Sequence, residues 1–151
     1  MRSWLASDAE LDQAARLLAE FRDWFGKSVP SDEEMRASVA RIHAGDGEFL
    51  LGALDGEPVG VCQVRYRWSV WASAEDAWLE DVFVRDAARG SGLGRALVQA
   101  AIERARERGC RRIELDVDEA NAPALALYRS LGFSGELKAD ARSLLLGLRL
   151  R

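Results

Sequence analysis

A glycine-rich junction, the stretch VFVRDAARGSGLGRALVQAA at residues 82–101, constrains the fold of this chain more than any other segment. Three glycines, Gly90, Gly92 and Gly94, separate an apolar run typical of a strand from a run with the apolar spacing of a helix. Glycine lets the backbone approach an anion at a helix N-terminus, where free N–H groups and the helix dipole favour negative charge. The stretch therefore predicts a strand, a phosphate-binding turn and a helix in succession.

Periodicity and turn signals divide the other residues into elements of one domain, residues 1–151. Capping boxes at Ser7 with Glu10 and at Ser31 with Glu34 open two helices. The first half is expected to contain a strand over 2–6, a helix ended by residues 27–30, and a second helix ended by Gly45 and Gly47. Two strands within 48–68 that meet at Asp55-Gly56 follow, and then a strand over 77–85. After the glycine loop we expect a helix ended by Gly109, a strand over 111–117, a helix ended by Gly132, and closing strands at Leu137 and Leu144–Leu150. This order, β-α-α-β-β-β-α-β-α-β-β, predicts an α/β (α+β) mixed sheet with helices on both faces.

The composition limits the class of partner. A formal charge of −4 and a pI near 5.1 argue against nucleic acid and agree with cationic small molecules. No apolar run approaches the about 20 residues of a membrane span, and the charged N-terminus is not a signal peptide, so we expect a cytoplasmic protein with no membrane partner. One histidine and two separated cysteines, Cys62 and Cys110, exclude a recognisable metal site, and both thiols are expected to be buried.

Three phosphate-binding patterns compete for the glycines. The dinucleotide fingerprint G-x-G-x-x-G fails because Arg95 or Leu97 stands where its third glycine is required. The P-loop pattern fails because Phe21 stands where a glycine should precede residues 26–28. The third pattern, [RQ]-x-x-G-x-[GA], fits residues 89–94, between a strand and a helix.

In this loop the sequence resembles the GNAT superfamily of N-acetyltransferases, whose acyl-CoA pyrophosphate loop has the same form. A second segment, NAPALALYRSLGF at residues 121–133, is similar to the family pattern N-x-x-A-x-x-L-Y-x-x-x-G-F at every defining position. The resemblance covers residues 50–135 and extends more weakly to the N-terminal helices. It implies a single-domain, mostly antiparallel sheet, acetyl-CoA as co-substrate, and transfer of an acetyl group to a primary amine by direct attack.

The resemblance also implies how acetyl-CoA is held. Backbone N–H groups of the glycine loop receive the pyrophosphate, and the strand before the loop pairs through its backbone with the pantetheine arm. The arginines of the loop add charge or belong to a solvated face, and the asparagine before the last helix contacts CoA or only caps that helix. The predicted cofactor-binding residues are Val82, Phe83, Val84, Arg89, Gly90, Ser91, Gly92, Leu93, Gly94, Arg95 and Asn121.

Two adjacent carboxylates and one tyrosine are the candidates for the chemistry. Neighbouring strand residues point to opposite faces, so a sheet covered on both sides places Glu80 or Asp81 in apolar surroundings, where its pKa rises. The resemblance implies that Glu80 is the base, acting directly or through water, unless it lies at a frayed strand end. Asp81 binds the substrate amine or pairs with an arginine. Tyr128 is implied as the acid that protonates the departing thiolate, or is a core aromatic.

The acceptor is expected to be a small cationic amine. Trp68, Trp71 and Trp78 surround a turn that contains Glu75 and Asp76, and aromatic rings with carboxylates suit a cation-binding pocket. The segment resembles the polyamine and diamine acetyltransferase branch, which makes Trp71 a substrate-contacting candidate. The alternative is a hairpin whose tryptophans fill a core or a dimer surface.

Other functions stay open from the sequence. A protein N-terminus, a protein lysine or an aminoglycoside could replace the small amine as acceptor. A non-catalytic acyl-CoA sensor is the alternative of another class, although intact Glu80 and Tyr128 argue against it. A homodimer is also expected, because family members are often dimers and the apolar Leu144–Leu150 segment could form the contact.

Overall fold

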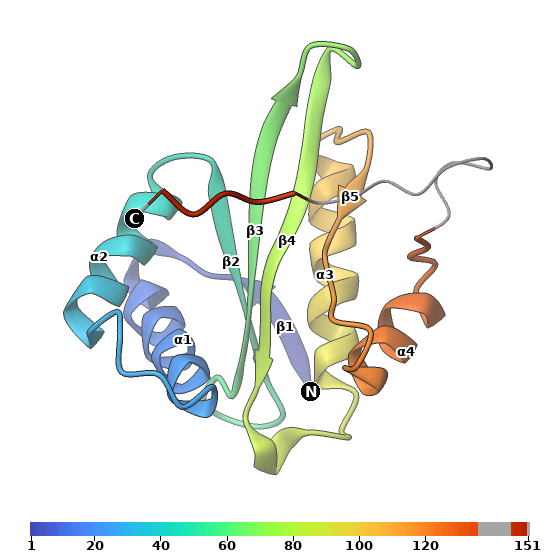
Figure 1. The fold of residues 1–151 in the computed structure, drawn as a ribbon. Coiled ribbons are helices and arrows are strands. Elements are labelled where there is room, and N and C mark those ends of the chain that lie inside the picture. The colour runs from blue at the N-terminus through green and yellow to red at the C-terminus, as the bar shows by residue number, and fades with distance from the viewer. Residues whose placement is uncertain (136–145, 151) are drawn as a thin grey trace. The chain divides into compact units, whose positions relative to one another are not determined.

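The computed structural model describes residues 1–135 and 146–150, and the chain divides into two compact units, residues 1–116 and 117–151. The first unit contains the sheet and three long helices, and the second contains one helix (Figure 1). No helix among the described residues combines the length and the apolar character needed to cross a membrane.

The elements follow the expected order as far as the last helix. They are β1 (Arg2–Leu5), α1 (Leu11–Trp24), α2 (Asp32–His43), β2 (Gly47–Ala53), β3 (Gly60–Ser69), β4 (Ala74–Val84), α3 (Leu93–Glu107), β5 (Ile113–Glu114) and α4 (Ala122–Ser130), with one-turn 3-10 helices at Asp8–Glu10 and Asp86–Ala88. Both predicted capping boxes are formed, one at Ser7 with Glu10 and one at Ser31 with Glu34. In the second box the Ser31 N–H donates to the Glu34 carboxylate at 2.7 Å.

Within the described residues the sheet has five strands in the order β1-β2-β3-β4-β5. The first four strands are antiparallel to their neighbours, and β5 runs parallel to β4. This confirms a mixed, mostly antiparallel sheet. The last strand is much shorter than the expected 111–117, because it pairs only at Ile113 and Glu114.

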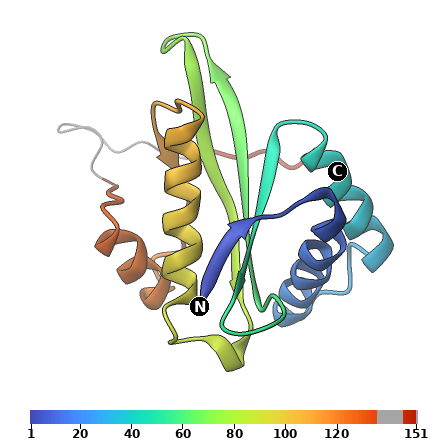
Figure 2. The same cartoon turned by 180° about the vertical axis from the view of Figure 1, so that it is seen from behind.

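Helices cover both faces of the sheet (Figure 2). On one face, Phe49, Leu51 and Val61 form a buried core with residues of α1. On the other face α3 approaches the sheet closely, since a Cβ at Gly52 would lie 2.9 Å from Leu93 Cδ1. The predicted two-sided covering is confirmed, and glycine in β2 makes the close approach of α3 possible.

The closing strands differ from the expectation. Leu137 and Leu144 lie outside the described residues. Residues 146–150 carry no strand, and the side chains of Leu146, Leu148 and Leu150 are 84–88% exposed. The prediction of a strand is therefore wrong for these residues: apolar alternation alone does not make a strand where no described neighbour supplies its backbone hydrogen bonds.

Candidate functional site

A β-bulge interrupts the pairing of β3 with β4 where the two carboxylates lie. Gln63 pairs with Asp81 and Val64 pairs with Leu79, which leaves Glu80 as the extra residue of β4. An extra residue on one strand shifts the alternation of every side chain beyond it. The bulge therefore decides which face each carboxylate occupies.

Both carboxylates lie on the face of the sheet that α1 and α2 cover. Asp81 stands opposite Gln63 and two residues before Phe83, whose ring stacks on Phe21 of α1 at 5.1 Å between centroids. Glu80 lines a pocket on the same face. The expectation that adjacent residues point to opposite faces is wrong at this position, because the bulge breaks the alternation.

The less exposed member of the pair is Asp81, which is half-buried, while Glu80 is exposed. Burial, and then the neighbouring charge of Glu80, raise the pKa of Asp81 from 3.8 to about 6. Both effects disfavour the charged carboxylate. The expected carboxylate in apolar surroundings thus exists, and it is the second residue of the pair.

Because its pKa is raised, Asp81 should lower the stability of the protein as the pH rises. The folded state binds this proton more tightly than the unfolded chain, so stability is lost between about pH 4 and pH 6, by up to about 3 kcal/mol. Asp81→Asn should therefore unfold at higher denaturant concentration than the parent at pH 7 and equally at pH 3.5. Urea unfolding at both pH values measures this difference. A less stable Asp81→Asn variant at pH 7 would contradict the assignment.

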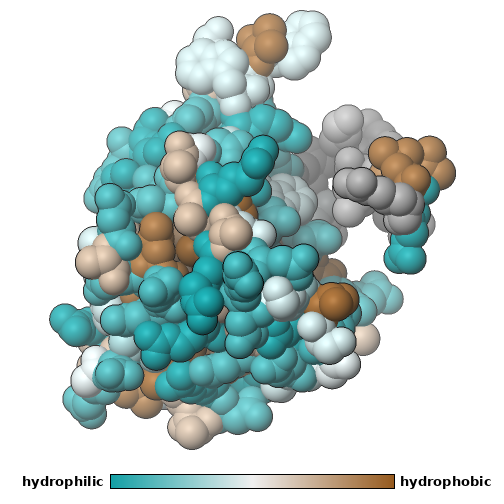
Figure 3. Space-filling model, turned by 90° about the vertical axis from the view of Figure 1, so that its left-hand side faces the viewer, coloured by the Kyte–Doolittle hydropathy of each residue, from teal (hydrophilic) through white to brown (hydrophobic). Residues whose placement is uncertain are grey.

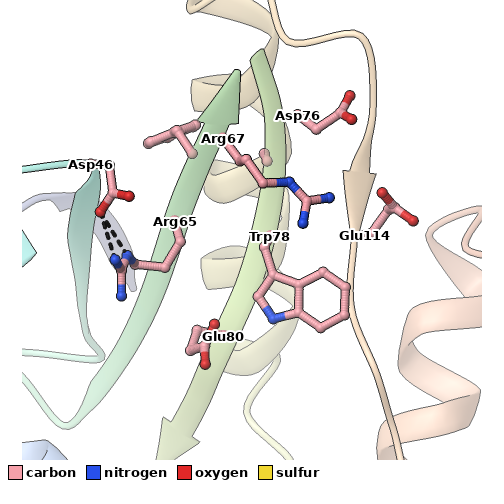
Figure 4. A pocket seen from close by; sticks show the side chains of 9 residues that line it. Asp46, Arg65, Arg67, Asp76, Trp78, Glu80 and Glu114 are labelled. Carbon is pink, nitrogen blue, oxygen red and sulfur yellow. Dashed lines mark hydrogen bonds and ion pairs between the residues drawn. The ribbon is translucent and has the colours of Figure 1, made fainter. Parts of the chain in front are cut away.

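A pocket of about 250 Å³ opens beside the bulge (Figure 4). It lies where the second half of β3 and the first half of β4 meet β5 and the turn before β2. Its lining residues are Asp46, Arg65, Tyr66, Arg67, Asp76, Ala77, Trp78, Glu80 and Glu114. The pocket thus joins the predicted base to charged residues of both signs and to one indole ring.

The glycine loop has the backbone that the sequence pattern predicts. Gly90 and Gly92 have φ angles of 75° and 90°, in the left-handed region that favours glycine. Ser91 fixes the turn, since its hydroxyl donates to the Ala88 carbonyl at 2.7 Å and accepts from the Leu93 N–H at 3.3 Å. The first intrahelical bond of α3 runs from the Ala96 N–H to the Gly92 carbonyl. The Leu93 N–H is occupied by the Ser91 hydroxyl, and the next N–H groups of the first turn lie ahead of the Ala96 bond, at the helix end where a phosphate binds.

Arg89 ties the loop to its surroundings. Its guanidinium donates to the Val84 carbonyl at 3.1 Å, pairs with Asp86 at 3.0 Å and lies 4.9 Å from the centre of the Trp24 ring. Its side chain is still 44% exposed. Arg89 is thus more than a solvated residue, because it fixes the end of β4 against the loop.

The outer edge of β4 is open along the stretch that leads to the loop. Pairing with β5 ends at Trp78 and Glu114, so within the described part of the first unit residues 79–84 have no strand on that side. Val82 and Phe83 lie on this stretch, and Val84 ends it. An unpaired strand edge offers backbone donors and acceptors to an extended ligand.

The two predicted residues of the second unit sit on α4. Asn121 is the N-cap of this helix, and its side chain accepts from the Ala124 N–H at 3.3 Å. The Tyr128 ring meets the Phe133 ring edge-on at 5.8 Å. The capping function of Asn121 is thus present, and the roles of Asn121 toward CoA and of Tyr128 as an acid stay predictions.

The structure separates the tryptophans that the sequence groups together. Trp78 lines the pocket, whereas Trp71 lies at the tip of the β3–β4 hairpin and is 97% exposed. Trp68 and Val70 beside it are exposed as well. The space-filling view shows a group of side chains that projects from the surface (Figure 3). Trp71 is therefore not brought together with Glu80.

Sequence reasoning missed four charged residues of the pocket, Asp46, Arg65, Arg67 and Glu114. The alternation of Arg65 and Arg67 on one strand face was the available signal, since β-strand residues two apart share a face. Among the described residues no group of three histidine, cysteine or acidic side chains is arranged to hold a metal ion. Cys62 is buried and Cys110 is half-buried, and both are free thiols.

Known proteins are similar to this chain in sequence and in fold. Residues 14–133 match the model of the Acetyltransferase (GNAT) family. The chain is 32% identical over 134 residues to the thialysine N-epsilon-acetyltransferase of Bos taurus, which covers 83% of this chain and 77% of that protein. It is 38% identical over 120 residues to the streptothricin acetyltransferase of Streptomyces lavendulae, and the match covers 72% of this chain and 61% of that protein. The crystal structure of a protein from Arthrobacter sp. FB24 matches with a TM-score of 0.86 and 28% identity, and the match covers 99% of this chain and 95% of that chain.

Proposed function

The chain belongs to the GNAT acetyltransferase family and is an acyltransferase, and from this premise we propose that it moves an acetyl group from acetyl-CoA to a primary amine of a small cationic acceptor. GNAT acetyltransferases use acetyl-CoA. The relatives described above are named for thialysine and for streptothricin. Their names support an amine acceptor for this chain. Which amine it accepts must be inferred from the residues of its own pocket.

One observation carries the proposal. Glu80, the bulged residue of β4, lines the pocket, and the unpaired edge of the same strand leads to the glycine loop. Acetyl-CoA, when bound, supplies an acyl group activated as a thioester. The N–H groups at the start of α3 would hold its pyrophosphate, and the backbone of Val82 and Phe83 would bind the pantetheine arm and the carbonyl oxygen. The acceptor amine would then enter from the pocket.

The carboxylates prepare the amine for attack. An ammonium group has no lone pair, so one proton must leave before nitrogen can attack a carbonyl carbon. Glu80 faces the pocket and would take that proton, directly or through a water molecule. Asp81 lies beside it and would add negative charge that attracts the ammonium group. The two residues would thus divide the work between proton transfer and attraction of the cation.

Glu80→Gln tests this role, because it keeps the shape of the side chain and removes the base. At pH 7 we expect kcat/KM to fall by about 10²-fold, the lower end of the about 10²–10⁴-fold that general acid–base catalysis typically contributes. The loss should shrink as the pH rises, because free amine becomes available without the carboxylate. The measurement is thiol release from acetyl-CoA between pH 6 and pH 10, with Glu103→Gln on α3 as control. A profile parallel to the parent's would contradict the role of Glu80.

The same assay decides between the classes of function. Release of thiol with any small amine supports an enzyme, and binding of acetyl-CoA without release would indicate a sensor. A panel of small diamines, basic amino acids, an aminoglycoside and a lysine peptide then ranks the acceptors. A strong preference for the peptide would overturn the small-molecule assignment.

A further inference from the structure

The charges in the pocket are largely paired with one another or with neighbouring arginines. Asp46 holds Arg65 at 2.6 Å. Asp76 lies 3.4 Å from Arg111 and 3.3 Å from Arg112, and Glu114 lies 2.7 Å from Arg112. These pairs neutralise three of the acidic side chains and one of the two arginines that line the pocket.

Two charges of opposite sign are left, Arg67 and Glu80. Among the described residues neither side chain has an ion-pair partner within 4.0 Å, although both line the same pocket and both are exposed. In Figure 4, Arg67, Trp78 and Glu80 follow one another from top to bottom. The pocket therefore offers a guanidinium at one end, a carboxylate at the other and an indole ring between them.

The spacing of these groups sets the length of a matching ligand. Arg67 stands opposite Asp76, and Glu80 comes four residues after Asp76 along β4. Four residues of a strand span roughly 13 Å, and a bulge shortens that distance. Both side chains line the pocket and form no ion pair with one another within 4.0 Å, so a ligand that meets both must carry its own two charges on separated groups.

We propose that the acceptor is a basic amino acid, acetylated on its side-chain amine, and that Arg67 determines this specificity by binding the carboxylate. The inference rests on the proposed function, and it names the substrate class for the same site. The side-chain ammonium would meet Glu80, the carboxylate would meet Arg67, and the methylene chain would lie against Trp78. A guanidinium binds a carboxylate through two parallel hydrogen bonds, which gives orientation as well as affinity.

The same residues disfavour a diamine. A second ammonium group in place of the carboxylate would meet Arg67, and like charges repel. At that end of the pocket Asp76 Oδ2 and Glu114 are engaged by Arg111 and Arg112, while Asp76 Oδ1 is buried and has no hydrogen-bond partner among the described residues. The selection for a negative group therefore rests on Arg67, the exposed guanidinium at the end away from Glu80.

Three acceptors of nearly equal length test the proposal: lysine, lysinamide and cadaverine. Lysinamide keeps both amines and removes the negative charge, and cadaverine lacks the carboxyl group altogether. We expect kcat/KM for lysine to exceed that for lysinamide by about 10–100-fold, mainly through KM, because a charge-assisted contact is lost in a partly exposed site. Equal values for the three acceptors, or a preference for cadaverine, would overturn the proposal.

Arg67→Ala separates a specificity role from a structural one. The ratio of lysine to lysinamide in kcat/KM should fall to about one, and Arg67→Lys should restore part of it. Arg106→Ala is the matched control, since Arg106 is an exposed arginine of α3 that pairs with Glu103 and lies outside the pocket. Its ratio should equal the parent's.

The outcomes distinguish the two proposals. No thiol release with any amine would overturn the proposed function itself. Release with amines but an unchanged lysine-to-lysinamide ratio in Arg67→Ala would overturn only the role of Arg67. A thermal melt of each variant checks that it is folded, and Arg67→Gln, which keeps part of the stem and removes the charge, provides the test if Arg67→Ala is not folded.

Discussion

Gly92→Val is expected to weaken the binding of CoA by at least about 100-fold. Gly92 is the N-cap of α3 with a φ of 90°, and the N–H groups that follow it would receive the pyrophosphate. A β-branched side chain would hold the phosphates away from these groups, and the loss of two charge-assisted hydrogen bonds accounts for a factor of this size. Calorimetric titration with CoA measures the change directly.

Gly109 provides the matched control at the other end of the same helix. It also has a left-handed φ, 75°, and a Cβ there would meet nothing within 4 Å. Valine at either position should cost roughly 1–2 kcal/mol of backbone strain. Only Gly92→Val should lose CoA affinity, and equal losses in both variants, or unchanged affinity in a folded Gly92→Val protein, would remove the assignment of the loop.

Tyr128→Phe should lower kcat by about 10²–10⁴-fold, equivalent to roughly 3–5 kcal/mol of transition-state stabilisation. We propose that its hydroxyl protonates the departing thiolate. A phenol has an ordinary pKa of about 10, so it holds its proton at neutral pH and can donate it to a developing thiolate. The thiolate exists only late in the reaction, and the loss should therefore appear in kcat. Steady-state kinetics with acetyl-CoA measure it.

The ring contact with Phe133 makes this variant conservative. Phenylalanine keeps the aromatic packing, so thermal stability and CoA affinity should change little. A thioester with a better leaving group needs less protonation, and with it the defect should shrink. If Tyr128→Phe keeps the parental kcat with acetyl-CoA, the tyrosine is only a packing residue of the α4 segment.

The fold could be predicted from local signals because most elements carry their own. The capping boxes form at Ser7 and Ser31 as predicted, and the glycines of residues 90–94 separate β4 from α3. The closing segment lacked such a signal. Alternating leucines over residues 146–150 satisfy the pattern of a strand, but strand formation depends on a partner that the pattern does not specify.

The candidate site was predictable where it depends on backbone and less so where it depends on register. The glycine loop requires left-handed angles at Gly90 and Gly92, and only glycine adopts these readily. The face of Asp81 instead depends on a bulge that forms between two strands, and nothing in the stretch LEDVFV marks it. Trp71 was grouped with Trp78 by closeness in sequence, whereas the length of the hairpin carries it to the tip.

The bulge keeps the candidate base outside the pairing of the sheet. Leu79 and Phe83 lie on opposite faces although they are four residues apart, because Glu80 is an extra residue between the two paired segments. Deleting Glu80 would restore a continuous ladder with the same partners, Leu79 opposite Val64 and Asp81 opposite Gln63, so Phe83 would stay opposite Val61 and keep its contact with Phe21 of α1. The carboxylate thus occupies a position of β4 that can be lost without moving a core side chain, whereas a deletion elsewhere in the strand would shift the register.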